Sequence, residues 1–223
     1  MPRAATPALK ALTGSFRLAS SLDQIIVDGA GHLSGTSTKS IDGSIVEFTF
    51  TGTYAIATNC TGTATFTNQS SQTEHDKIFL NTVNTTGIYT GAFLIQTDSQ
   101  HVQSSIAVAQ GTATCTNLGV KNSYSLELTG TVIGTGEVAG AGRLALNGSG
   151  SITGTETVSL YGSIHTASVT GTYKINSNCT GTAILNPAGL SPMHLTLAVV
   201  NGGKQMMAIE TDANTIVTGT FQE

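Results

Sequence analysis

Three side chains in the second half of the chain could do chemistry together: Glu156, His165 and Tyr173. Alternation with a period of two places Glu156 on the apolar face of one predicted strand, and His165 and Tyr173 on the apolar face of the next. A tight hairpin at residues 161–162 would set Glu156 and His165 diagonally within side-chain reach. A carboxyl and an imidazole beside a phenol could orient a ligand or transfer a proton. These residues are therefore the candidate catalytic set, and the alternative is that Glu156 and His165 are solvated at open strand ends.

Three cysteines are the other reactive groups. Cys60 and Cys179 stand in identical Asn-Cys-Thr-Gly-Thr-Ala segments, whereas Cys115 has no counterpart. A Cys60–Cys115 disulfide would leave Cys179 free, and a free thiol in an exported protein could also join two chains. The sequence leaves the pairing of these disulfide candidates open. No Cys-x-x-Cys pair and no histidine pair with zinc-ligand spacing occurs, so we expect neither a metal site nor a cofactor.

A long internal repeat determines where these residues stand. Residues 28–66 and 147–185 align without a gap at an offset of 119, and 20 of the 39 positions are identical. Further matches join residues 12–15 to 128–131 and residues 95–98 to 209–212. The chain therefore consists of two homologous copies, predicted at residues 12–117 and 118–223. Residues 1–11 precede the first copy, and we expect them to be disordered or exchanged between chains.

The elements expected in each copy are β-strands, because apolar and polar residues alternate and no segment has a helical period. Turn signals divide the second copy into about eight strands, at residues 124–131, 138–146, 151–160, 163–175, 180–185, 194–200, 205–211 and 215–221. The predicted fold is all-β, with two tandem antiparallel units of about eight strands, each closing into a barrel to remove its edges. A β-sandwich and a single merged barrel are the alternatives.

Composition excludes several classes of function. Only 10% of the residues are charged, and nine Lys and Arg against 13 Asp and Glu give a net charge of −4. Nucleic-acid binding needs a basic face that this chain does not have. The longest apolar runs, such as residues 195–200, are too short for a membrane-spanning helix. Low charge with much Thr, Ser, Asn and Gly is typical of exported β-proteins, so we expect an extracellular or cell-surface protein whose signal peptide has been removed. A cytoplasmic protein is the alternative.

Two motifs have a predicted structural role. Asp98 and Asp212 each end the sequence Ile-Gln/Glu-Thr-Asp, and we expect them to cap turns through hydrogen bonds from backbone N–H groups. The repeated glycines at 29, 31 and 35, and at 148, 150 and 154, are typical of turns and bent strands. They form no nucleotide-binding loop, because no helix follows them.

The motifs Asn/Asp-Gly-x-Gly-x-Ile/Leu-x-Gly, Gly-Thr-Tyr and Asn-Cys-Thr-Gly-Thr-Ala resemble those of uncharacterised secreted repeat proteins of soil bacteria, notably acidobacteria. This resemblance covers most of both copies and implies export and a β-rich fold, without an activity. A fainter resemblance, at the level of the fold, is to the allene oxide cyclase and dirigent-type barrels. Those barrels have eight antiparallel strands and bind apolar ligands, and no catalytic residue of theirs can be matched here.

These observations favour a non-enzymatic extracellular protein that self-associates: a surface, matrix or filament subunit, or an adhesive module. Duplicated β-units can assemble by adding strands between chains. One alternative is a barrel that binds a small apolar ligand in its interior. Another is a cyclase- or isomerase-type barrel enzyme in which Glu156, His165 and Tyr173 orient the substrate and transfer protons.

Overall fold

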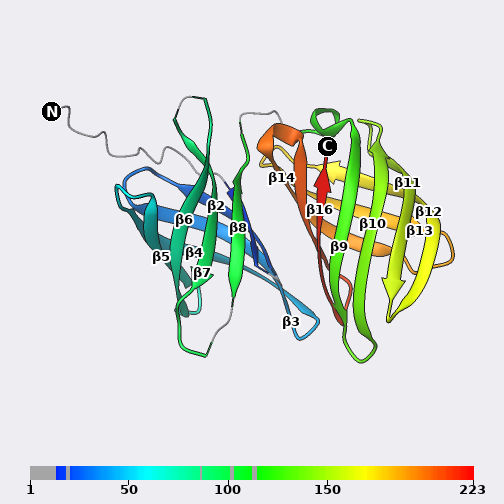
Figure 1. Ribbon diagram of the computed structural model, residues 1–223, viewed down its shortest axis with the longest axis horizontal. Helices are drawn as coiled ribbons and strands as arrows, with labels where there is room; N and C mark the ends of the chain where they lie inside the picture. The colour runs from blue at the N-terminus through cyan, green and yellow to red at the C-terminus, as the bar shows by residue number, and fades with distance from the viewer. Residues whose placement is uncertain (1–13, 19–20, 86, 101–102, 112–114) are drawn as a thin grey trace. The chain divides into compact units, whose positions relative to one another are not determined.

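The computed structural model describes residues 14–18, 21–85, 87–100, 103–111 and 115–223 (Figure 1). The predicted exchanged segment, residues 1–11, lies outside them. The chain divides into two compact units, centred on residues 47–109 and 110–223. Within the described residues, the helices are the short 3-10 turns η1 (Leu118–Val120) and η2 (Asn201–Gly203). The all-β prediction is confirmed.

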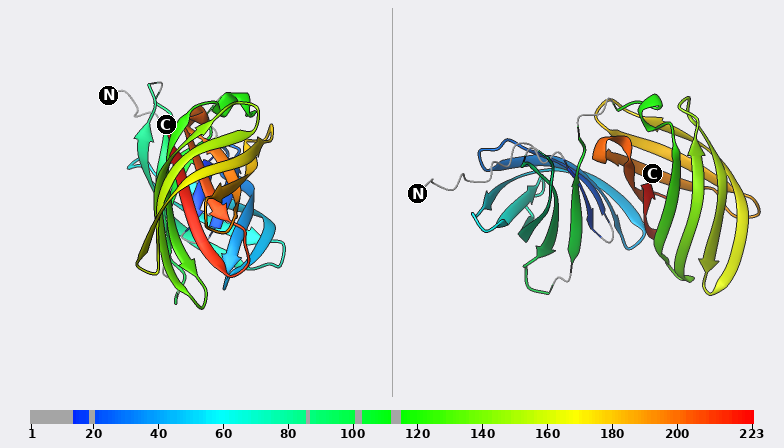
Figure 2. Two further views of the ribbon diagram at one scale, coloured as in Figure 1. Left: turned by 90° about the vertical axis from the view of Figure 1, so that its right-hand side faces the viewer. Right: turned by 45° about the horizontal axis from the view of Figure 1, so that its top comes forward.

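The first copy of the repeat forms eight antiparallel strands in the order of an up-and-down barrel, and β1 pairs with β8 (Figures 1 and 2). Its strands are β1 (Gly14–Leu18), β2 (Ser21–Val27), β3 (His32–Ile41), β4 (Ser44–Ile56), β5 (Thr61–Asn68), β6 (Thr73–Val83), β7 (Tyr89–Gln96) and β8 (Ser104–Ala109). Sequential strands are neighbours throughout, as the short predicted links require.

The second copy has the same order, and β16 pairs with β9 to close the barrel. Its strands are β9 (Ser123–Val132), β10 (Gly136–Leu146), β11 (Ser151–Leu160), β12 (Ser163–Ile175), β13 (Thr180–Pro187), β14 (Met193–Val200), β15 (Gln205–Glu210) and β16 (Thr215–Gln222). The prediction of two barrel-like units is confirmed, and each copy forms its own sheet rather than part of a merged barrel. Closure pairs every strand on both sides and leaves no free sheet edge.

The alternation in the sequence determines which side chains enter each barrel. On β12, Val169, Tyr173 and Ile175 are buried, whereas Thr170 and Thr172 are exposed. Thr suits the solvated face because its β-branched side chain fits the pleated strand. The sheet is therefore half-buried along its length, with one face on the core and the other in water.

Two glycines at equivalent places of the repeat are required by the close packing of neighbouring strands. A Cβ at Gly52 would clash with the carbonyl oxygen of Thr65, and a Cβ at Gly171 would clash with that of Ile184. Each of these carbonyls belongs to the next strand of the sheet. The strand positions keep glycine in both copies because any side chain would force the two strands apart.

The two interiors differ in how completely they are filled. In the second barrel, Met206 on β15 pairs with Phe221 on β16, and both side chains are almost fully buried. The matched segments 95–98 and 209–212 align β7 with β15, so that Ala92 corresponds to Met206. Ala92 pairs with Ala107 on β8. Ala107 therefore corresponds to Phe221, the partner of Met206. Two of the large side chains that fill the second barrel are therefore alanines in the first.

We expect Phe221→Ala to lower the free energy of unfolding by about 3–5 kcal/mol, because removal of a fully buried phenyl ring leaves a cavity in a packed core. Leu118→Ala is the control, since Leu118 is 70% exposed, and it should change stability by no more than about 0.5 kcal/mol. Urea unfolding followed by circular dichroism measures both. A loss below about 1 kcal/mol for Phe221→Ala would show that this interior is not tightly packed.

Candidate functional site: the barrel interiors

Glu156 lies inside the second barrel, where it is 3% exposed. Neither carboxylate oxygen has a hydrogen-bond partner among the described residues. On the next strand Ala167 is directly opposite Glu156, and His165 is opposite Val158. His165 is thus the diagonal neighbour of Glu156, in the register that the sequence predicts. Burial raises the pKa of the Glu156 carboxyl above its ordinary value, because the apolar surroundings disfavour its charged form.

The other two residues of the candidate catalytic set are placed differently. His165 is exposed near the end of β12, and no hydrogen bond joins it to Glu156. The Tyr173 hydroxyl accepts the backbone N–H of Gly148 at 2.8 Å and donates to the carbonyl of Asn117 at 3.1 Å. Both hydrogen bonds of that hydroxyl are therefore made within the protein. The structure brings the three residues onto one face of the sheet but forms no hydrogen-bonded catalytic network from them.

The segment that precedes β9 is fastened to the second barrel. Cys115 and Val120 belong to the same buried cluster as the residues that fill this barrel. Asn117 accepts the backbone N–H of Ile175 on its side-chain oxygen at 2.7 Å. Together with the Tyr173–Asn117 hydrogen bond, these contacts satisfy buried polar groups that would otherwise be unpaired. Residues 115–120 thus complete the core of the second unit.

A disulfide between Cys115 and Cys179 holds the same segment. The predicted alternative of a Cys60–Cys115 bridge with Cys179 free is wrong, because Cys115 packs into the second barrel beside Cys179. Cys60 is the free cysteine, and its Sγ lies 2.7 Å from the Tyr89 hydroxyl. Cys60 and Cys179 have the same backbone conformation, each with φ of 66°. The repeat therefore conserves the turn, while only one copy uses its cysteine for a bridge.

Histidine–aspartate pairs recur at equivalent places in the two copies. The backbone N–H of His75 donates to Asp98 at 2.8 Å, and His75 Nδ1 lies 2.7 Å from the other oxygen of Asp98. His194 and Asp212 make the same two contacts at the same distances. These carboxylates accept backbone N–H groups from the neighbouring strand, whereas the turn-capping prediction required N–H groups of their own turns. Hydrogen bonds from His75 lower the pKa of Asp98 to about 2, because they stabilise its charged form.

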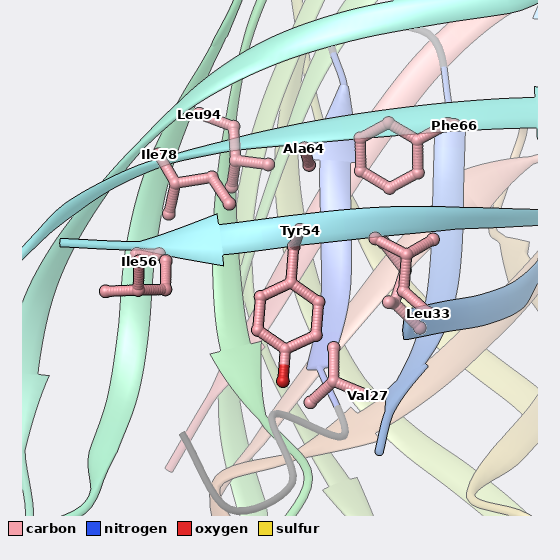
Figure 3. Close-up of a pocket in the computed structure, with 10 residues that line it drawn as sticks. Val27, Leu33, Tyr54, Ile56, Ala64, Phe66, Ile78 and Leu94 are labelled. Carbon is pink, nitrogen blue, oxygen red and sulfur yellow. The ribbon is translucent and has the colours of Figure 1, made fainter. Parts of the chain in front are cut away.

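The interior of the first barrel is more open than that of the second. Tyr54, Ile56 and Phe66 pack against its core but remain partly exposed. Their counterparts Tyr173, Ile175 and Leu185 are buried in the second barrel. Tyr54, Ile56 and Phe66 line an apolar cavity of about 20 Å³ in the first barrel. Figure 3 shows them there, with the Tyr54 hydroxyl directed towards Val27. The cavity is not closed off from solvent, because part of its lining is exposed.

An acidic side chain projects into this open interior. Asp76 on β6 is 5% exposed, and its Oδ1 has no hydrogen-bond partner among the residues that the structure describes. Burial, followed by the charges of Glu74, Asp98 and Asp23, raises the pKa of Asp76 to about 7. The corresponding residue of the second copy is Leu195, because Asp76 pairs with Ala64 as Leu195 pairs with Ala183. The carboxyl is thus a feature of the first copy alone.

Sequence reasoning missed Asp76, although a signal for it exists. Along β6 the inward positions are Glu74, Asp76, Ile78 and Leu80, so the same alternation that singles out Glu156 also places Asp76 on the apolar face. The match of Ala64 to Ala183 in the repeat would then have shown a carboxyl where the second copy has leucine. The pairing of Cys115 had no comparable signal, because Cys115 lies outside the matched segments.

Metal and membrane sites receive no support from the described part of the chain. It contains no group of three or more His, Cys, Asp or Glu side chains arranged to hold a metal ion. Within the same residues, no helix has the length and apolar character needed to cross a membrane.

Comparison with known proteins gives no family for this chain: no protein-family model matches it, and no curated protein matches its sequence.

We expect Glu156→Gln to become more stable relative to the unmodified protein as the pH rises. The folded pKa of Glu156 lies above the ordinary 4.5, so the folded state binds this proton more tightly than the unfolded state does. The contribution to stability is complete below about pH 4.5 and is lost as the pH rises towards the folded pKa. Glutamine cannot ionise and has no such loss.

The measurement is the difference in unfolding free energy between Glu156→Gln and the unmodified protein, from urea titrations at a series of pH values from about 4.5 upward. The other buried carboxyls are the same in both proteins and cancel in this difference. A difference that does not change with pH would show that burial does not raise the pKa of Glu156.

We expect alkylation of the oxidised protein under denaturing conditions to modify Cys60 alone, because Cys115 and Cys179 are joined. Peptide mass mapping identifies the modified residue, and modification of Cys179 would contradict the assigned bridge. Removal of the bridge by Cys115→Ser should lower the unfolding free energy by about 4 kcal/mol in the chain-entropy model, because the closed loop spans 64 residues. The matched control is Cys60→Ser, which removes no bridge.

Proposed function

We propose that this chain is a non-enzymatic, exported β-repeat protein that self-associates head to tail. The observation that carries the proposal is a row of apolar side chains on the outer face of the first barrel. Phe79, Phe93 and Ile106 lie directly opposite one another on β6, β7 and β8. Each is 45–50% exposed. Ile95, next along the same face of β7, is also exposed.

Such a row is unusual for a sheet face in water. Elsewhere on the outer faces Thr and Ser occupy many of the equivalent outward positions, as on β12. Contiguous exposed apolar side chains commonly mark interaction surfaces in soluble proteins. Two phenyl rings directly opposite each other supply a large apolar area, which favours association once that area is removed from water.

The second copy carries a different exposed apolar group. The hairpin between β11 and β12 presents Tyr161 and Ile164, which is 66% exposed. One chain therefore has an apolar sheet face in its first copy and an apolar hairpin in its second. A contact between two unlike surfaces leaves one of each unused in a dimer, so further chains can add. Such head-to-tail contacts generate rings if the rotation closes and filaments if it does not. This property supports a filament, surface or matrix subunit.

The interior of the second barrel supports a role without catalysis. Side chains fill it, and the Tyr173 hydroxyl is engaged by Gly148 and Asn117. The Cys115–Cys179 disulfide supports export, since disulfides persist in oxidising compartments such as the extracellular space. The exported location agrees with the resemblance of the repeat motifs to secreted proteins.

We expect the double substitution Phe79→Thr with Phe93→Thr to keep the chain monomeric at concentrations where the unmodified chain associates. Threonine retains the strand preference while removing the apolar rings. Ile164→Lys should have the same effect from the opposite surface. Ile184→Thr, on the outer face of β13, removes an exposed apolar residue that belongs to neither surface, and this variant should associate normally.

Sedimentation velocity over a wide range of concentrations gives the masses, and negative-stain microscopy of the associated fraction shows rings or filaments. A monomeric unmodified protein throughout would overturn the proposal. So would unchanged association of the Phe79 and Phe93 double variant.

A further inference from the structure

A row of inward positions crosses the first barrel from β4 to β7. Tyr54 pairs with Ala64, Ala64 with Asp76, and Asp76 with Gln96. Three polar atoms on this row are buried without a hydrogen-bond partner in the described structure: Tyr54 Oη, Asp76 Oδ1 and Gln96 Oε1. Buried polar atoms are normally paired, and an unpaired one costs about 1–3 kcal/mol. Gln96 Oε1 is an amide oxygen and can accept a hydrogen bond but not donate one. The same holds for Asp76 Oδ1 when the carboxyl is ionised.

The charges around this row are almost all negative. Within the described part of the chain, the negative charges of Glu74, Asp98 and Asp23 act on Asp76, and His75 is the group of opposite sign that acts on it. His75 directs its Nδ1 to Asp98 rather than to Asp76. The Gln96 side-chain N–H also donates to Asp98, at 3.3 Å. The Gln96 carbonyl oxygen is left without a partner among the described residues. The interior therefore offers unpaired acceptors in a negative field, and a cation with N–H donors complements both.

Apolar side chains adjoin the acceptors. Ile78 follows Asp76 by two residues on the same face of β6, and Leu94 stands opposite Ile78 on β7. Both line the cavity, together with Phe66 (Figure 3). Phe66 is partly exposed, so the apolar wall continues from the cavity to an accessible surface. A ligand with a short hydrocarbon chain would bury that chain here.

We propose that the interior of the first barrel binds a small primary amine in its ammonium form. The nitrogen donates to Asp76 Oδ1 and Gln96 Oε1, and the short alkyl group lies against Ile78, Leu94 and Phe66. Ammonium provides three N–H donors, which suits a site made of acceptors. Desolvation of Asp76 is then compensated by a charge-assisted hydrogen bond, roughly twice as strong as a neutral one.

The second copy supplies an internal comparison. It has Leu195 and Glu210 where the first copy has Asp76 and Gln96, and the Tyr173 hydroxyl is already paired. In the second barrel, Met206 and Phe221 fill the interior at the places where the first barrel has the smaller Ala92 and Ala107. The amine site thus belongs to the first copy alone, and its existence does not depend on self-association.

The test uses butylamine, butanol and butanoate as probes at neutral pH, with the full chain carrying Phe79→Thr and Phe93→Thr to keep it monomeric. Methyl-selective NMR follows the resonances of Ile78 and Leu94 during each titration. We expect butylamine to bind at least about tenfold more tightly than butanol, and butanoate not to bind, because only the ammonium gains a charge-assisted hydrogen bond.

Asp76→Asn, which keeps the shape of the side chain, should abolish the preference for the amine, as should Asp76→Leu, which copies Leu195. Glu156→Gln is the matched control, since it neutralises a buried carboxyl in the other barrel and should leave amine binding unchanged. Equal affinity for amine and alcohol, no shift with butylamine, or full amine binding by Asp76→Asn would each overturn the proposal. If Asp76→Leu does not fold, Asp76→Asn alone decides.

Discussion

The interior of a closed eight-stranded barrel must be occupied, and the two copies meet this constraint in different ways. Closure satisfies the backbone hydrogen bonds of every strand, but it also encloses a volume just wide enough for side chains to fill. In the second copy, large residues such as Met206 and Phe221 fill it, and residues 115–120 complete the core. In the first copy, Ala92 and Ala107 stand at the matching places, and the inward side chains remain partly exposed. The two copies of the repeat have therefore diverged: side chains fill the interior of the second barrel but leave the interior of the first partly exposed.

Buried carboxyls show the cost of this divergence. Glu156 lies in the filled barrel and Asp76 in the open one, and burial raises the pKa of both. Neither finds full hydrogen bonding inside the protein. A buried carboxyl such as Glu156, with apolar neighbours and no hydrogen-bond partner among the described residues, lowers the stability of the fold. The same group beside a cavity and an accessible apolar wall can be satisfied by a ligand, which is why the open barrel carries the binding proposal.

The outer surface is governed by the same alternation. Each inward apolar residue fixes its neighbours as outward, and Thr at many of those positions keeps the sheet face solvated. The row of Phe79, Phe93 and Ile106 breaks that rule on three adjacent strands. It cannot serve the core, because its side chains point away from it. We propose that this row contacts the exposed hairpin of the second copy on another chain.

The sequence by itself determined the strand content, the duplication and the inward and outward faces, because period-two alternation and repeated turn residues are local signals. It also determined the diagonal placement of Glu156 and His165, since a tight hairpin sets the register of the two strands it joins. Tertiary structure alone decided that Cys115 bonds to Cys179, because that pairing depends on how residues 115–120 pack against the second barrel. It alone also decided that the Tyr173 hydroxyl is engaged while the Tyr54 hydroxyl is unpaired. Identical motifs acquire different surroundings when the volume around them is filled by residues far away in the chain.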